Sequence, residues 1–143
     1  MAHGDKGRYK EKRKGSILDP KIARSLEKKI SDGKISCARA TAIAAELGVS
    51  MNEVGVSIDL MEIELEKCQL GLFGYGEKKL IVKPADNVPV DLEKVIRNAL
   101  AGGRLPCAAA WRIAEELGVA KMDVSSACET LKIKIKPCQL GAF

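Results

Sequence analysis

Apolar residues recur with a helical period in two blocks of this chain. Each block opens with an apolar residue at every fourth position, which predicts an amphipathic helix. These residues are Ile22, Leu26 and Ile30 in the first block, and Leu92, Ile96 and Leu100 in the second. Asp19-Pro20 is a typical helix start, and Gly33 is a typical helix end. The first block therefore predicts a helix between these two signals.

Two further helices are predicted after a short extended piece in each block, within residues 40–61 and 109–131. In the first block, a helix ends at Gly48, where glycine permits the positive φ that a tight turn requires. The next helix begins at about residue 51 and buries Val54 and Ile58. The turn is expected to direct Val49 into the core, and its counterpart is Val119.

The period then changes from helical to strictly alternating. Residues 62–68 and 132–138 alternate polar with apolar residues, which predicts two half-buried strands. Their exposed positions carry glutamates in the first block and lysines in the second. Because opposite charges stabilise paired strands, one hypothesis pairs these strands with each other, within the chain or in a dimer. The alternative is two separate strands with solvent-exposed charges.

The two blocks are copies of one module. Residues 18–73 align with 88–143 without a gap, and 17 of the 56 pairs are identical. We therefore predict a basic tail at 1–16, a first repeat at 17–74, a linker with a possible strand at 75–87, and a second repeat at 88–143. The fold class is mainly α with small β elements, the two repeats packing as a pseudo-twofold pair.

The corner of each module resembles the helix-turn-helix of bacterial transcriptional regulators. Ala44 is followed by Gly48 and then by Val54, with the same spacing in the second repeat. The preceding helix and the following strand are similar to the winged-helix variant. This resemblance implies DNA binding, with the second helix of each corner in the major groove. The residues it would bring to DNA are Ser50, Asn52, Lys121, Ser125 and Ser126.

Charge adds a second nucleic-acid signal in the tail. The formal net charge is +5, and most of it lies in residues 1–16. The basic residues there are Lys6, Arg8, Lys10, Lys12, Arg13 and Lys14. They could contact DNA phosphates as the basic arms of DNA-binding proteins do. No apolar run is long enough to span a membrane and no secretory signal is present, so a cytoplasmic protein is expected.

A protein-interaction role is the alternative to DNA binding. The outward positions of the first recognition helix hold no basic residue, and Glu53 and Asp59 would repel a duplex. A neutral helix of this kind suits an adaptor that binds a partner protein or forms a homodimer. Catalysis is not expected, because the only histidine is His3 and no phosphate-loop or dinucleotide motif is present. No cofactor is expected either.

Four cysteines occupy equivalent positions in the two repeats and suggest a third function. They are Cys37, Cys68, Cys107 and Cys138. Each repeat could hold a thiol couple, or the four together could bind a metal, giving a redox or metal sensor. The simpler interpretation is that these cysteines are small buried apolar residues. Cys128 fits that interpretation, because it replaces Ile58 of the first repeat.

Overall fold

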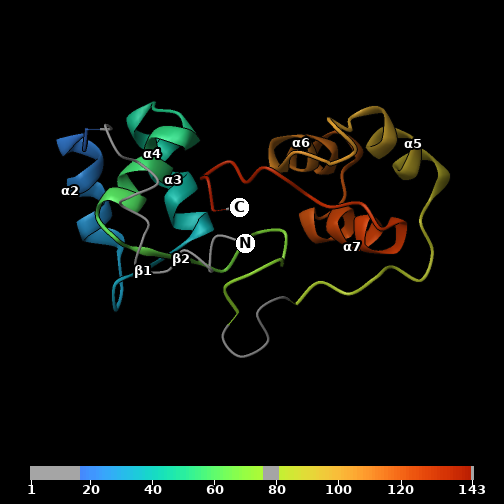
Figure 1. Ribbon diagram of the computed structural model, residues 1–143, viewed down its shortest axis with the longest axis horizontal. Coiled ribbons are helices and arrows are strands. Elements are labelled where there is room, and N and C mark those ends of the chain that lie inside the picture. Colours follow the sequence, from blue (N-terminus) through green and yellow to red (C-terminus); the bar gives the residue numbers. More distant parts are fainter. Residues whose placement is uncertain (1–16, 76–80, 143) are drawn as a thin grey trace. The chain divides into compact units, whose positions relative to one another are not determined.

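A computed structural model describes residues 17–75 and 81–142 of the chain (Figure 1). In these residues the protein is mainly helical with small β elements, as the sequence predicts. It has six helices and one parallel sheet of two strands. The chain forms two compact units. Of the described residues, unit 1 contains 17–68 together with 139–142, and unit 2 contains 69–75 and 81–138.

Unit 1 follows the predicted order of elements closely. Its elements are α2 (Pro20–Lys29), β1 (Lys34–Ser36), α3 (Cys37–Leu47), α4 (Met51–Leu60) and β2 (Glu64–Glu66). The Asp19 carboxylate accepts a hydrogen bond from the Lys21 N–H at 2.8 Å and so caps α2. Gly48 ends α3 with φ 65°, a left-handed conformation that favours glycine. The three helices pack pairwise against one another.

Unit 2 repeats this arrangement with α5 (Val90–Asn98), α6 (Cys107–Leu117) and α7 (Lys121–Leu131). Gly118 ends α6 with φ 66°, as Gly48 does in unit 1. Ile81 and Val82 form no strand, and their N–H groups both donate to the Gly71 carbonyl. Leu80, the remaining residue of the possible linker strand, lies outside the described residues.

Each alternating segment pairs with the short extended piece of its own repeat. In unit 1, β1 and β2 are parallel, with Lys34 opposite Glu64. In unit 2, the Leu105 N–H donates to the Lys134 carbonyl at 2.9 Å, and the Lys136 N–H donates to the Leu105 carbonyl at 2.8 Å. Each charged segment thus has a partner within its own repeat. The hypothesis that the two charged segments also pair with each other, within the chain or in a dimer, stays a prediction.

The core of each unit comes from the residues that the periodicity predicts to face inward. Ile22, Leu26, Ile43 and Val54 are almost fully buried in unit 1. Their counterparts in unit 2 are Leu92, Ile96, Ile113 and Val124, which are also buried. Val119 departs from the prediction, because 37% of it is exposed. Its N–H donates to the Ala114 carbonyl to close the turn, and its side chain lies at the surface.

Two segments that follow the alternating residues lie on the third helix of a unit. We call residues 69–73 the first Leu-Gly segment and residues 139–142 the second. The first belongs to unit 2, where the Ser125 hydroxyl donates to the Leu70 carbonyl at 2.6 Å. The second belongs to unit 1, where the Leu140 carbonyl meets α4 at Gly55. The last residues of each repeat therefore belong to the unit that contains the helices of the other repeat. No sequence signal predicted this exchange.

We expect Ser125→Ala to lower the stability of the protein. The hydroxyl is fully buried, and its loss leaves the buried Leu70 carbonyl without this donor. The free energy of unfolding should fall by about 1–3 kcal/mol. Urea denaturation measures this change, with Ser126→Ala as the control because it makes the same replacement one residue along α7. Equal stability of the two variants would contradict the role given to the hydroxyl.

Candidate functional site

The start of α4 holds the two residues predicted to read DNA from the first repeat. The Ser50 hydroxyl accepts a hydrogen bond from the Glu53 N–H at 3.1 Å, and the Glu53 carboxylate accepts one from the Ser50 N–H at 3.0 Å. This capping box satisfies free N–H groups at the helix start. Ser50 thus has a structural role, whereas Asn52 is exposed beside it.

Beyond the first turn of α4, residues that were predicted to face outward are buried. Gly55 and Asp59 were expected to face a duplex, but both are buried. A side chain at Gly55 would overlap the Leu140 carbonyl, so the second Leu-Gly segment lies directly on the helix backbone. Only the first turn of α4 presents exposed polar groups, and none of them is basic. Direct reading of bases by α4 is therefore restricted to this turn.

The three residues of α7 that were predicted to contact DNA differ in how exposed they are. Ser125 is fully buried and donates to Leu70, so it does not face solvent as predicted. The close packing of the first Leu-Gly segment on α7 is the physical reason. Ser126 is half-buried, and its carbonyl accepts from the Ala85 N–H at 3.1 Å. Lys121 is half-exposed, with its ammonium 4.8 Å from the centre of the Trp111 ring.

A row of exposed basic residues runs along the paired segments of unit 2. We call Arg104, Lys132, Lys134 and Lys136 the basic row, and all four are exposed. The Leu105–Ile135 bridge sets the register, which places Arg104 next to Lys134. At the same two positions of unit 1, Lys34 and Glu64 form an ion pair of 3.6 Å. Unit 2 thus replaces an ion pair with two like charges.

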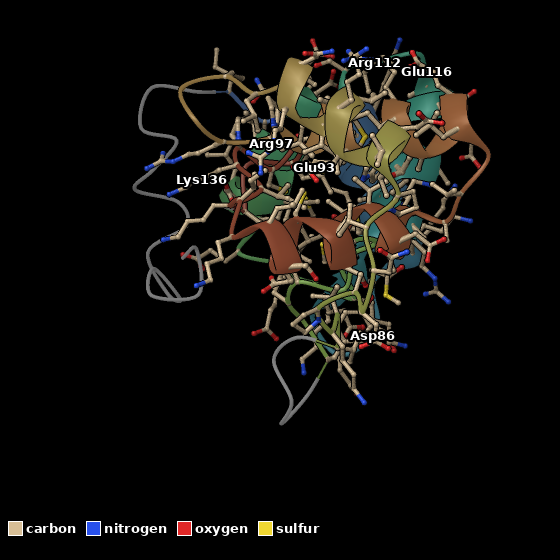
Figure 2. All side chains as sticks on the ribbon, turned by 90° about the vertical axis from the view of Figure 1, so that its right-hand side faces the viewer. Asp86, Glu93, Arg97, Arg112, Glu116 and Lys136 are labelled. Carbon is tan, nitrogen blue, oxygen red and sulfur yellow. The ribbon has the colours of Figure 1, made fainter. Side chains whose placement is uncertain are left out.

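Two arginines of unit 2 outside the basic row form ion pairs with neighbouring carboxylates. Arg97 pairs with Glu93 on α5 at 2.8 Å, and Arg112 pairs with Glu116 on α6 at 3.7 Å. Figure 2 labels both ion pairs together with Lys136. No member of the basic row forms an ion pair with another residue in the described part of the chain. The basic row is therefore a group of four exposed positive charges without a carboxylate partner among the described residues.

The three lysines of the basic row were expected either to pair with the glutamates of the first repeat or to be solvent-exposed charges of a separate strand. Arg104 was not predicted to belong to this group, because only the register of the paired segments shows that it lies next to Lys134. The comparison of the repeats could have found it, since Arg104 aligns with Lys34 and Lys134 aligns with Glu64. The tail residues Lys6, Arg8, Lys10, Lys12, Arg13 and Lys14 lie outside the described residues.

A groove of about 390 Å³ lies at the corner between α6 and α7. It is lined by Trp111, Ala114, Glu115, Val119, Ala120 and Lys121. The Trp111 indole nitrogen is buried without a hydrogen-bond partner. Leu117, on the same helix, is 40% exposed. The corner of unit 2 therefore has an apolar surface with a charged rim.

The repeated cysteines lie where the paired extended segments of each unit end. Cys37 and Cys107 are the first residues of α3 and α6. The Cys107 N–H donates to the Pro137 carbonyl at 3.0 Å, so its backbone lies beside that of Cys138. All five cysteines are thiols, and Cys138 alone among them is not buried. Within the described residues, no group of three or more histidine, cysteine, aspartate or glutamate side chains could hold a metal ion.

Comparisons with protein families, with curated proteins and with solved structures returned no match to this chain. In the described ranges, each helix is too short or too polar to cross a membrane. The assignment of a function therefore rests on the geometry of the chain itself.

The Cys128 thiol makes the stability of unit 2 depend on pH. Burial raises the pKa of this thiol to about 11, and the negative charge of Glu129 contributes to the same shift. Above pH 9 the unfolded chain loses the proton while the folded chain retains it. The free energy of unfolding should therefore decrease as the pH rises from about 9 towards 11, and this thiol should have no effect below that range.

Urea denaturation of the native chain and of Cys128→Val across this pH range measures the effect. Valine is apolar and does not titrate, and the other titrating groups are common to both proteins. The difference in stability between them should change in favour of the variant at high pH. Parallel curves would show that Cys128 does not titrate differently in the two states.

Proposed function

We propose that this protein binds double-stranded DNA as a cytoplasmic regulator, and that it grips the phosphate backbone through the basic row of unit 2. The observation that carries the proposal is the position of Arg104 next to Lys134, where unit 1 has the Lys34–Glu64 ion pair. We also propose that each of the two repeats is a winged-helix-like module.

Like charges at neighbouring positions of paired strands destabilise a fold. Unit 2 carries such a pair at an exposed position, flanked by Lys132 and Lys136. A phosphate between the side chains would convert the repulsion into two attractive interactions. The basic row therefore suits a ligand with regularly spaced phosphates, and a nucleic-acid backbone has this property.

The position of the basic row agrees with a winged-helix mode of binding. It begins at Lys132, which directly follows the end of α7. In the resemblance drawn from the sequence, α7 would be the recognition helix and this segment would lead into the wing. Ser125 is buried and so is not placed to contact base edges, and Lys121 is the one basic residue of α7. We infer that phosphate contacts dominate and that sequence discrimination is weak.

The basic tail would add to the same interaction. Its six lysines and arginines could contribute a slope of up to about −5 in log K against log salt. The four residues of the basic row would add up to about −3.6 by the same rule. These two contributions can be separated, because the tail and the basic row can be changed independently.

A protein-interaction adaptor is the second candidate function. The observation in its favour is the groove of unit 2, where Trp111 and Val119 form an apolar surface beside exposed Leu117. The absence of basic residues from the exposed first turn of α4 agrees with it. On this alternative, DNA would bind only through the tail. The sensor role of the cysteines stays a prediction.

We expect Lys134→Glu to weaken DNA binding while it stabilises the fold. The variant restores at Arg104 the kind of ion pair that Lys34 and Glu64 form in unit 1. The free energy of unfolding should rise by roughly 0.2–1 kcal/mol. DNA affinity at 0.1 M salt should fall by about eightfold or more, and the salt slope should become shallower by about 1. Fluorescence anisotropy with a labelled mixed-sequence duplex measures affinity across salt concentrations.

The control is the double variant Arg97→Gln and Arg112→Gln. It changes the net charge by the same amount, but it removes arginines that are already paired with glutamates. Its salt slope should equal that of the native chain. A third protein that lacks residues 1–16 measures the contribution of the tail. If this protein does not bind DNA and Lys134→Glu leaves the native slope unchanged, the basic row does not contact DNA.

A further inference from the structure

The second Leu-Gly segment is recognised at the level of its backbone. It belongs to unit 1 although the residues before it belong to unit 2. Leu140 is 2% exposed, and its carbonyl occupies the space that a side chain at Gly55 would need. Gly141 has φ 79°, a conformation that favours glycine. The contact thus depends on a leucine, on a following glycine and on the absence of a side chain on α4.

Unit 2 has the same geometry at the equivalent positions. Leu70 is fully buried, and its carbonyl accepts the hydrogen bond from Ser125, the residue that aligns with Gly55. Gly71 has φ 74°, and a side chain there would come within 2.7 Å of the Met122 sulfur. Two helices of one chain therefore hold the same short sequence at equivalent positions, one through a close backbone approach and the other through a side-chain hydrogen bond. This repetition indicates a binding site with a defined ligand sequence.

We propose that the surface of α4 around Gly55 is a peptide-binding site, and that it can take the Gln-Leu-Gly segment of a second copy of this chain. We call this surface the Gly55 site. The occupant in the structure is residues 139–142 of the same chain. This segment is attached to the other unit, so unit 1 receives its ligand as it would receive one from another molecule.

Mass action determines which copy fills the Gly55 site. A tethered segment acts at an effective concentration of about millimolar for short flexible connections, so it outcompetes a second copy in dilute solution. A chain whose own segment cannot bind should accept the segment of another chain. Exchange of an identical element between protomers is a common route to dimers. The site therefore links the concentration of the protein to its assembly.

Two complementary variants test the exchange in the full chain. Gly55→Ala closes the site, because the new side chain overlaps the Leu140 carbonyl, and it leaves the segment free. A chain that lacks residues 139–143 has an open site and no segment. Mixed together, the two should form a 1:1 complex in sedimentation velocity, although each alone is a monomer. Leu140→Asp provides a second open-site chain of full length, in case the deletion does not fold.

A synthetic peptide of residues 137–143 with Cys138→Ser measures the site directly. It should bind the open-site chain and compete with the Gly55→Ala chain for it. Adding Gly55→Ala to the open-site chain should weaken peptide binding by about tenfold or more, since overpacking against backbone has few means of relief. Asn52→Ala, at an exposed position of the same helix, should leave binding unchanged. If neither open-site chain binds the peptide or the Gly55→Ala chain, the proposal is wrong.

Discussion

The structure depends on one contact that occurs twice: the carbonyl of a leucine packs against the third helix of a unit. In unit 1 this contact needs Gly55, because any side chain there would occupy the position of the Leu140 carbonyl. In unit 2 it uses the hydroxyl of Ser125 as a hydrogen-bond donor. Both solutions close the middle of a helix that a helix-turn-helix protein would normally present to DNA. The position of this contact decides which surfaces remain for a partner.

With those helix faces closed, the difference between the repeats becomes the best guide to function. The repeats share the helices, the glycine corner and the Leu-Gly segment, which together explain the fold. They differ in the charge of one exposed segment, where Lys34 and Glu64 of unit 1 correspond to Arg104 and Lys134 of unit 2. A fold does not require this change, since unit 1 adopts the same arrangement with an ion pair. The anion binding that we propose would explain why one copy carries repulsive charges.

Much of the fold could be predicted from local signals. Asp19-Pro20, Gly48 and the alternating residues 62–68 marked elements that the structure contains, because caps, left-handed turns and side-chain period act over a few residues. The position of the Leu-Gly segments could not be predicted, because periodicity does not say which unit a segment joins. Ser125 was misplaced for this reason: its burial comes from Leu70, which is 55 residues away in the sequence.

The basic row is a second feature that local sequence signals could not predict, because it depends on which segments pair. Its lysines were visible as an alternating pattern, and opposite charge suggested that they pair with the glutamates of the first repeat. The parallel register of each repeat with its own extended piece places Arg104 next to Lys134. Of the charges that looked complementary between repeats, one set contributes to an internal ion pair, and the other is exposed without a carboxylate partner among the described residues. The two copies make an equivalent backbone contact but place different charges on it. In a duplicated protein, such differences indicate which copy binds a ligand.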